Sequence, residues 1–376
     1  MTGYEMEPIE TETTAAYENA DRLSYFYTVY DGFQRAARAT RGVTDRFYTI
    51  GPDTIRLRFA GEGLIPHLAL ALAHLETGPV SVPALTVCLW DSVSTATRLP
   101  LLVSTLVELL HSNPWAWLDA RAVIKGFNNS RIQTNFAPGS GVLSVLDAQQ
   151  NLAVYWVNDG SRLPYYEKGS PLKGILSCWT ASRSCQYLHA GAVGKPAGGV
   201  LLAGKGGSGK STTALACISA GLSYASDDYC LVASDPLPYV YSLYNTAKLG
   251  GDEDIRRFPH LVPLVSNPDR ADGEKLMIFL QQHFPSQVVR GFPIRAVLLP
   301  RITGQPETRL RPATAGAALA ALAPSTIFQL PNAGPEAMRS MAKLLRQVPC
   351  YALECGTDVS RIPPVIEELL SGVACT

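Results

Sequence analysis

The chain has 376 residues, of which 47% are hydrophobic and 17% charged, a composition typical of a globular protein with two or three domains. Its 32 basic and 32 acidic side chains balance to a formal net charge of +0, so composition gives no indication of a polyanion-binding surface. No apolar run approaches about 18 residues, and the acidic N-terminus lacks the apolar core of a secretion signal. We therefore expect a cytoplasmic protein that binds neither membrane nor nucleic acid.

The eight cysteines are scattered along the chain, and no two of them form a C-x-x-C pair. Disulfide frameworks and zinc sites both show regular cysteine spacings, which this sequence lacks. We expect buried, reduced thiols and no cysteine-bound metal. The positions are Cys88, Cys178, Cys185, Cys217, Cys230, Cys350, Cys355 and Cys375.

Residues 1–165 are predicted to form an N-terminal mixed α/β domain. Apolar residues recur at helical spacing in some segments, and alternate or run together at strand length in others. The prediction is a loose tail over 1–15, helices over 16–41, 64–75 and 100–110, strands over 54–59 and 84–90, and a hairpin of 141–146 with 152–157. No motif here indicates a reaction, and only the position of this domain suggests that it recognises a substrate.

A turn-rich segment at 164–171 predicts a boundary, and residues 166–376 are expected to form a second α/β domain with a central sheet flanked by helices. The expected helices cover 171–187, 212–220, 313–323, 334–347 and 362–372. The expected strands cover 188–193, 200–203, 222–228, 229–233, 296–300 and 351–354. Residues 240–290 are predicted to be rich in loops, with a charged middle at 250–257.

The sequence GKGGSGKS, from Gly204 to Ser211, satisfies G-x-x-x-x-G-K-[ST] in full and lies between a predicted strand and a predicted helix. Phosphate-binding loops require this context, because the glycines let backbone N–H groups converge on an anion at the helix N-terminus. Lys210 is expected to reach the β- and γ-phosphates of ATP, and the Ser211 hydroxyl to bind Mg²⁺. The alternative is a tight turn without a ligand. The candidate nucleotide-binding residues are Gly204, Gly206, Gly207, Ser208, Gly209, Lys210, Ser211 and Thr212.

Two carboxylates, Asp227 and Asp228, end the strand predicted over 222–228. We expect that strand to lie beside the phosphate-loop strand, which would bring both acids to the nucleotide. Phosphoryl transfer to a hydroxyl uses a metal ion on the phosphates and benefits from a carboxylate that accepts the hydroxyl proton. One division assigns Asp227 to Mg²⁺ and Asp228 to the proton, and the sequence leaves the order open. The alternative is a pair that caps a turn.

Leu-His-Ala-Gly at 188–191, the phosphate loop, and Ala-Ser-Asp-Asp at 225–228 together resemble the catalytic domain of HPr kinase/phosphorylase. The resemblance covers residues 185–235 well and 170–300 loosely, and it implies a kinase that uses ATP and Mg²⁺ and forms a homo-oligomer. It also implies a catalytic role for His189, which would orient the catalytic aspartate or contact the γ-phosphate. From the sequence alone, a histidine in a strand of small residues is also typical of a core position.

The family's Glu-x-Arg-Gly-Leu-Gly signature has no counterpart in this sequence. The chain therefore looks closer to divergent HPr-kinase-like proteins of modified-peptide pathways, some of which phosphorylate a serine of a lasso precursor peptide. The resemblance thus implies a peptide or protein substrate, such as a biosynthetic precursor peptide.

Weaker candidates for contact with phosphate or substrate are Lys248 and Lys275, whose alternative is a solvated surface position. Arg295 and Arg301 flank the predicted strand at 296–300, where a surface role is favoured over a charge-stabilising one. The sequence predicts an ATP- and Mg²⁺-dependent kinase that acts on a serine or threonine hydroxyl. Two alternatives stay open, a kinase for a small-molecule hydroxyl and a nucleotide-binding regulatory module without an acceptor.

Overall fold

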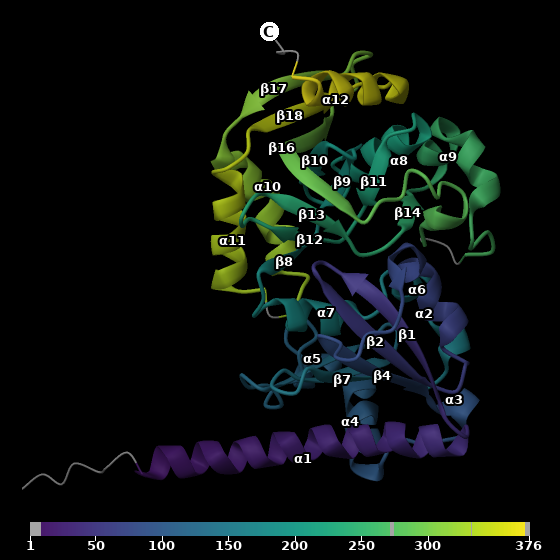
Figure 1. Ribbon diagram of the computed structural model, residues 1–376, viewed down its shortest axis with the longest axis vertical. Coiled ribbons are helices and arrows are strands. Elements are labelled where there is room, and N and C mark those ends of the chain that lie inside the picture. The colour runs from purple at the N-terminus through teal and green to yellow at the C-terminus, as the bar shows by residue number, and fades with distance from the viewer. Residues whose placement is uncertain (1–8, 271–273, 332, 373–376) are drawn as a thin grey trace, which may run out of the picture. The chain divides into compact units, whose positions relative to one another are not determined.

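The computed structural model describes residues 9–270, 274–331 and 333–372, whose helices and strands are shown in Figure 1. Mixed β-sheets are flanked by helices in these ranges, which confirms the α/β class predicted from the sequence. None of the helices in these ranges is both long enough and apolar enough to cross a bilayer.

The α-helices of the described residues are α1 (Ile9–Ala39), α2 (Ile65–Leu72), α3 (Ser92–Thr95), α4 (Leu101–Ser112), α5 (Pro114–Trp117), α6 (Tyr165–Gly169), α7 (Lys173–Thr180), α8 (Lys210–Ser219), α9 (Asp252–Arg257), α10 (Ala315–Ile327), α11 (Pro335–Leu345) and α12 (Ile362–Leu370). Short 3-10 helices cover Ala73–Leu75, Gly160–Arg162, Pro259–Leu264, Leu280–Gln282 and Val359–Arg361.

The first sheet has the strand order β3-β1-β2-β4-β7-β6-β5. Its strands are β1 (Val43–Ile50), β2 (Asp53–Ala60), β3 (Glu76–Thr77), β4 (Leu85–Asp91), β5 (Ile132–Ala137), β6 (Val142–Asp147) and β7 (Leu152–Val157). Strands β6 and β7 pair antiparallel as the predicted hairpin, and β4 joins β7 in parallel.

The second sheet has the order β11-β9-β10-β16-β13-β12-β8, and β18 pairs with both β16 and β17. A separate antiparallel pair joins β14 to β15. These strands are β8 (Cys185–Leu188), β9 (Gly191–Lys195), β10 (Gly198–Leu202), β11 (Ser223–Ser226), β12 (Cys230–Ala233), β13 (Tyr239–Ser242), β14 (Thr246–Leu249), β15 (Leu276–Phe279), β16 (Gly291–Ile302), β17 (Arg309–Ala313) and β18 (Cys350–Cys355).

Contacts divide the described residues into two compact units, one from the ranges 9–45, 56–64 and 84–162, the other from 46–55, 65–83 and 163–372. The second unit therefore includes two segments from the N-terminal part of the sequence. The division into a substrate-recognition domain of 1–165 and a catalytic domain of 166–376 stays a prediction.

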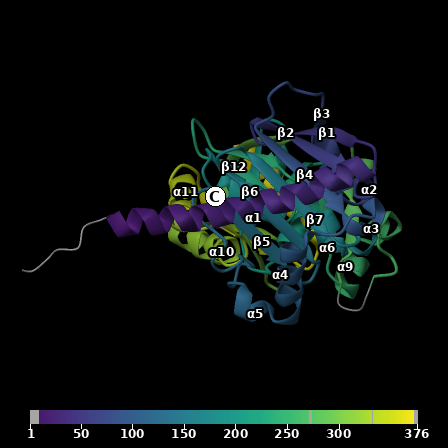
Figure 2. The same ribbon diagram turned by 90° about the horizontal axis from the view of Figure 1, so that it is seen from below.

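In the first unit, α1 lies across the strands β4, β7 and β6 (Figure 2). Phe26, Val29 and Phe33 recur on one face of α1 at the three- and four-residue spacing of an amphipathic helix, and all three are buried. They pack into one core with Trp90 of β4 and Val154 of β7. One face of α1 thus packs against the sheet, while Tyr27 and Asp31 of the same helix are exposed.

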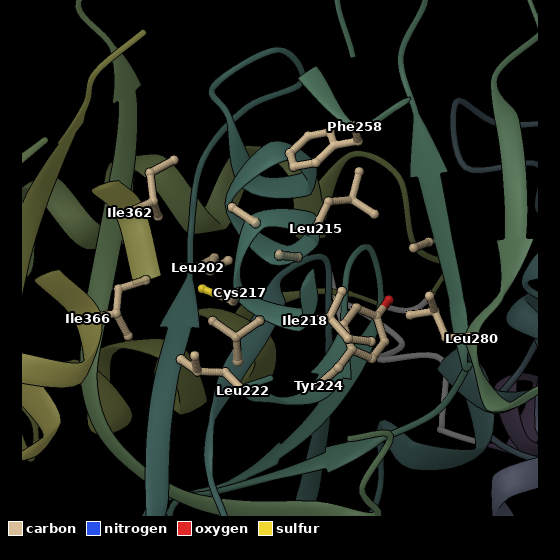
Figure 3. Close-up of a cluster of buried hydrophobic side chains, with 14 of the residues drawn as sticks. Leu202, Leu215, Cys217, Ile218, Leu222, Tyr224, Phe258, Leu280, Ile362 and Ile366 are labelled. Atoms are coloured by element: carbon tan, nitrogen blue, oxygen red, sulfur yellow. The ribbon is translucent and has the colours of Figure 1, made fainter. Parts of the chain in front are cut away.

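The core of the second unit surrounds α8, the helix that follows the glycine-rich loop (Figure 3). Leu215 and Ile218 of α8 are fully or almost fully buried among side chains of β10, β11 and α12. Ile362 and Ile366, one helical turn apart on α12, cover α8 from one side (Figure 3). Burial of α8 therefore fixes the position of its N-terminus, where the loop ends.

Three predicted elements need correction. The tail predicted over 1–15 is helical from Ile9, because α1 has no proline between Ile9 and Ala39; residues 1–8 lie outside the described residues. The helix predicted over 171–187 ends at Thr180, and its last residues belong to β8, which pairs with β12. The region 240–290 contains strands and α9 rather than mostly loops. In the last two cases, a strand of four residues is too short to show a periodicity, so its sheet partner decides.

Candidate nucleotide and phosphate-transfer site

The predicted histidine and acids lie on two neighbouring connections that cross the second sheet from one strand to a distant one. β8 and β9 are consecutive in the sequence but lie near opposite ends of the strand order, and so do β11 and β12. His189 lies in the first crossing, and Asp227 and Asp228 lie in the second. The Ser226 hydroxyl donates to the carbonyl oxygen of Ala190 at 2.9 Å and joins the two crossings. The topology thus brings residues almost forty positions apart together.

This arrangement differs from the predicted one in two respects. His189 was expected inside a continuous strand over 188–193, but it lies in the break between β8 and β9. β11 was expected beside the loop strand β10, but β9 lies between them. The acids still reach the loop because they follow the end of β11, where the chain turns toward β12.

The glycine-rich loop connects β10 to α8, as the motif requires. Gly207 and Gly209 have φ angles of 78° and 106°, which side chains other than glycine rarely adopt. A Cβ atom on Gly204 would lie 2.5 Å from the Ser208 hydroxyl oxygen. Two positive φ angles and one close approach therefore account for three of the four motif glycines.

Lys210, at the start of α8, is 7% exposed and turns its ammonium back onto the loop. Its Nζ donates to the carbonyl oxygens of Gly204, at 2.6 Å, and Lys205, at 3.2 Å. Burial lowers the pKa of Lys210, and the charges of Asp227 and Asp228 partly offset this effect. A phosphate oxygen near the ammonium would compensate its burial better than two neutral carbonyls.

Asp227 is 2% exposed and has one oxygen free for a further ligand. Its Oδ2 accepts from the backbone N–H of Lys248 at 3.1 Å, while Oδ1 is buried without a hydrogen-bond partner among the described residues. Burial and the neighbouring charge of Asp228 raise the pKa of Asp227, and the nearby Ser211 hydroxyl and the positive charge of Lys248 oppose this rise.

These two side chains fit Mg²⁺, which prefers hard oxygen ligands and retains several waters. The unpartnered Asp227 oxygen and the Ser211 hydroxyl oxygen would be the two protein ligands of the ion. No group of three or more histidine, cysteine or acidic side chains among the described residues has an arrangement that could hold a metal ion. The described cysteines are buried free thiols, and Cys375 lies outside the described residues.

Asp228 is held from both sides by cationic or hydrogen-bonding groups. Its Oδ1 lies 2.6 Å from His189 Nε2, and its Oδ2 lies 2.5 Å from Lys248 Nζ. Burial alone would raise the pKa of Asp228, but the charge of Lys248 and the hydrogen bond and charge of His189 together hold it well below its usual range. Asp228 is therefore an ionised carboxylate in a fixed orientation.

The loop, the acids and the predicted lysines line one cavity of about 570 Å³. Lys248 lies in β14 rather than in a loop, and its backbone and side chain contact both acids. Lys275, beside β15, also lines this cavity. Gly204 and Ser208 shape the loop but are not among the lining residues. The predicted residues that line the cavity are His189, Gly206, Gly207, Gly209, Lys210, Ser211, Thr212, Asp227, Asp228, Lys248 and Lys275.

The sequence reasoning missed several cavity residues, of which Asp254 has the clearest contacts. Asp254 accepts from the Gly250 N–H at 2.7 Å and from the Thr212 hydroxyl at 3.3 Å, so it ties α9 to the first turn of α8. The acidic start and basic end of 252–257 favour a short helix, and this signal could have identified α9. The residues missed are Tyr229, Gly250, Glu253, Asp254, Arg257, Ile302 and Gln329.

Arg295 and Arg301 lie outside this cavity lining. Arg301 forms an ion pair with Glu354 at 3.0 Å, and Arg295 donates to the carbonyl oxygen of Ala197 at 3.0 Å. Both therefore have structural partners away from the loop, in agreement with the surface role that the sequence favoured.

The fold and site together define an α/β protein with a phosphate-loop motif and a paired acid site. No family model and no curated protein matches the chain. Among solved structures, the chain is similar to the Hpr(Ser) kinase/phosphatase from Coxiella burnetii, with 13% sequence identity and a TM-score of 0.27. The similarity covers 50% of this chain and 95% of that chain, and at this level it carries no argument about activity.

Proposed function

We propose that this protein is an ATP- and Mg²⁺-dependent kinase that transfers the γ-phosphate to a serine or threonine hydroxyl of a peptide or protein. One observation carries the proposal. A complete phosphate loop and an ionised carboxylate, Asp228, line the same cavity, and Asp228 is oriented by His189 and Lys248. A nucleotide-binding loop alone would need no such oriented carboxylate.

The loop supplies binding and charge neutralisation in this proposal. Backbone N–H groups of 206–211 and the N-terminus of α8 would bind the phosphates, and Lys210 would exchange its two carbonyl partners for phosphate oxygens. Ser211 and Asp227 would hold Mg²⁺, which neutralises charge on the phosphates when it is bound. Asp254 would keep the first turn of α8 in place through Thr212.

Asp228 would accept the acceptor's proton. The bond between the γ-phosphorus and the bridging oxygen of ATP breaks, a bond to the acceptor oxygen forms, and the hydroxyl proton passes to Asp228. ADP and a phosphate monoester are the products. The loose transition state of phosphoryl transfer demands little base strength, so a carboxylate with a lowered pKa is adequate for this role.

The peptide or protein acceptor rests on sequence resemblance and on the extra N-terminal part of the chain, which we propose recognises the substrate. In the same proposal, residues 166–376 form the catalytic domain and the protein acts in the cytoplasm, with oligomer formation as an expectation from the resemblance.

The experiment is incubation of the full chain with ATP labelled in the γ-phosphate, Mg²⁺ and serine- or threonine-containing peptides. We expect the label to appear in the peptide and to resist treatment with acid. Peptides with alanine at the acceptor position should take up no label. Label found only as free phosphate would favour a regulatory module. Label found in small alcohols but not in peptides would favour the small-molecule kinase.

A further inference from the structure

A second cavity of about 290 Å³ adjoins the phosphate site and has a different chemistry. It is lined by Tyr165, Tyr166, Lys248, Glu274, Lys275 and Met277. Two aromatic rings and a thioether give it an apolar character, which the charged phosphate cavity lacks. The phosphate-transfer chemistry described above makes no use of these three side chains.

The two cavities share a wall. Lys248 and Lys275 line both of them, and the Lys248 ammonium binds Asp228. Burial lowers the pKa of Lys210, and the positive charge of Lys275 lowers it further, so the Lys275 ammonium lies near the phosphate loop. The second cavity therefore begins where the acceptor oxygen must lie in the proposed reaction, beside Asp228.

The walls of this second cavity are held by hydrogen bonds. The Tyr165 hydroxyl donates to the carbonyl oxygen of Ser266 at 2.7 Å, which fixes the ring. The Thr246 hydroxyl of β14 donates to the carbonyl oxygen of Gly169 at 2.9 Å, which ties α6 to the strand that carries Lys248. Met277 is 2% exposed and is held by its backbone N–H, which donates to Asn267 Oδ1 at 2.7 Å. These three hydrogen bonds thus hold the lining of the second cavity in place.

We propose that this second cavity is an acceptor subsite that takes an aromatic or large apolar side chain next to the serine or threonine to be phosphorylated. The proposal rests on the proposed function, which it makes more specific. A dry cavity of about 150 Å³ suffices to bind benzene, so one aromatic side chain fits the available volume. Ring contacts with Tyr165 and Tyr166 would supply the selectivity.

The test uses the full chain and three synthetic peptides. The reference peptide is acetyl-Gly-Gly-Ser-Gly-Gly-amide. In each of the other two, phenylalanine replaces one glycine, either the one directly before serine or the one directly after it. We expect one phenylalanine peptide to have an acceptor KM about three- to tenfold lower than the glycine peptide, the size of a favourable ring contact. Tyr166→Ala should remove the difference and leave the KM for ATP unchanged, while Tyr166→Phe should keep it.

Phe328→Ala is the matched control, because Phe328 is also an exposed aromatic residue of the second unit, at 69% against 47% for Tyr166, and lines neither cavity. It should keep the preference for phenylalanine. Equal KM values for all peptides in the wild type, or a preference that survives Tyr166→Ala, would overturn the subsite.

Saturation-transfer NMR with the phenylalanine peptides and ADP gives a readout that needs no transfer. Ring signals that depend on Tyr166, in a protein that phosphorylates no peptide, would support the subsite while the proposed function fails. Phosphorylation without any Tyr166-dependent ring signal would support the function while the subsite fails.

Discussion

At the scale of single residues, one carboxylate oxygen of Asp228 contacts His189 and the other contacts Lys248. These contacts determine how substitutions at this site should affect phosphate transfer. Asp228→Asn preserves the size of the side chain but removes the proton acceptor. We expect transfer to fall by about two to four orders of magnitude, the usual effect of a lost general base, with little change in ATP affinity. The measurement is single-turnover transfer together with equilibrium binding of Mg²⁺ and ATP.

Asp235→Asn is the control for that substitution, because Asp235 also pairs with a lysine, Lys343, but its side chain is 72% exposed. It should leave transfer unchanged. A parallel collapse of ATP binding in Asp228→Asn would show that Asp228 holds the metal or the structure rather than the acceptor proton.

Lys248 keeps the pKa of Asp228 low, so Lys248→Met should raise that pKa, because burial then acts with less opposition. The acid limb of the pH–rate profile is expected to move to higher pH. A group with a depressed folded pKa stabilises the protein above its unfolded pKa of about 3.9 and loses this effect in acid. The stability gap between wild type and Lys248→Met should therefore be largest near neutral pH and shrink as the pH falls.

Lys195→Met is the matched control for pH, since Lys195 forms a half-exposed ion pair with Glu367 at 2.9 Å. The pH–rate profile of Lys195→Met, including its acid limb, should match that of the wild type. An unshifted acid limb in Lys248→Met would mean that the titrating group is not Asp228.

Lys210→Ala tests the loop lysine itself. The substitution removes the buried ammonium that faces the phosphates, so we expect weaker ATP binding and no detectable transfer. Lys205→Ala, in the same loop but with an exposed side chain, should retain both properties. The assay is transfer of labelled γ-phosphate at saturating Mg²⁺, and normal turnover in Lys210→Ala would refute the role of the loop.

At the scale of elements, the turn from β10 into α8 depends on backbone conformations that glycine allows. Gly209 has a φ angle of 106°, so Gly209→Ala should destabilise the protein by about 1–3 kcal/mol. Gly206 has no positive φ angle, and a Cβ atom there would meet open space, so Gly206→Ala should leave folding unchanged. Urea unfolding measures both variants, and an equal loss in the two would contradict this account of the turn.

The sequence predicted the local parts of this region well because their signals are local. Strand, glycine-rich loop and helix follow one another within about twenty residues, and the acids, predicted as the last residues of a strand, come directly after β11, which ends at Ser226. The position of His189 against Asp228 depends on two crossings between distant strands of the sheet, which periodicity does not show. The sequence resemblance, rather than spacing, selected His189 from the six histidines.

The site residues that were missed share a physical reason. Asp254 and Arg257 lie on a six-residue helix, too short for a clear amphipathic pattern, and they reach the loop through tertiary contacts. Lys248 was a weaker candidate because its strand, β14, has four residues, too few to show a periodicity, and is placed by its pairing with β15. Short elements whose position is set by their neighbours are the part of this site that one sequence does not reveal.

At the scale of the whole molecule, the position of the site depends on the core around α8. Leu215 is fully buried there, so Leu215→Ala should cost about 2–5 kcal/mol of unfolding free energy. Leu237→Ala removes the same atoms from a side chain that is 72% exposed and should cost less than about 0.5 kcal/mol. Urea denaturation followed by circular dichroism compares them, and similar midpoints would show that α8 is not held by this core.

The central claim is that the loop binds a triphosphate while Asp228 faces the incoming hydroxyl. A crystal structure of the full chain with Mg²⁺ and a non-hydrolysable ATP analogue tests it most directly. We predict phosphate oxygens on the N–H groups of 206–211, the metal ion on Ser211 and Asp227, and Asp228 facing the terminal phosphorus. An empty loop in crystals that contain the analogue, or an Asp228 carboxylate that points away from the terminal phosphate, would contradict the claim.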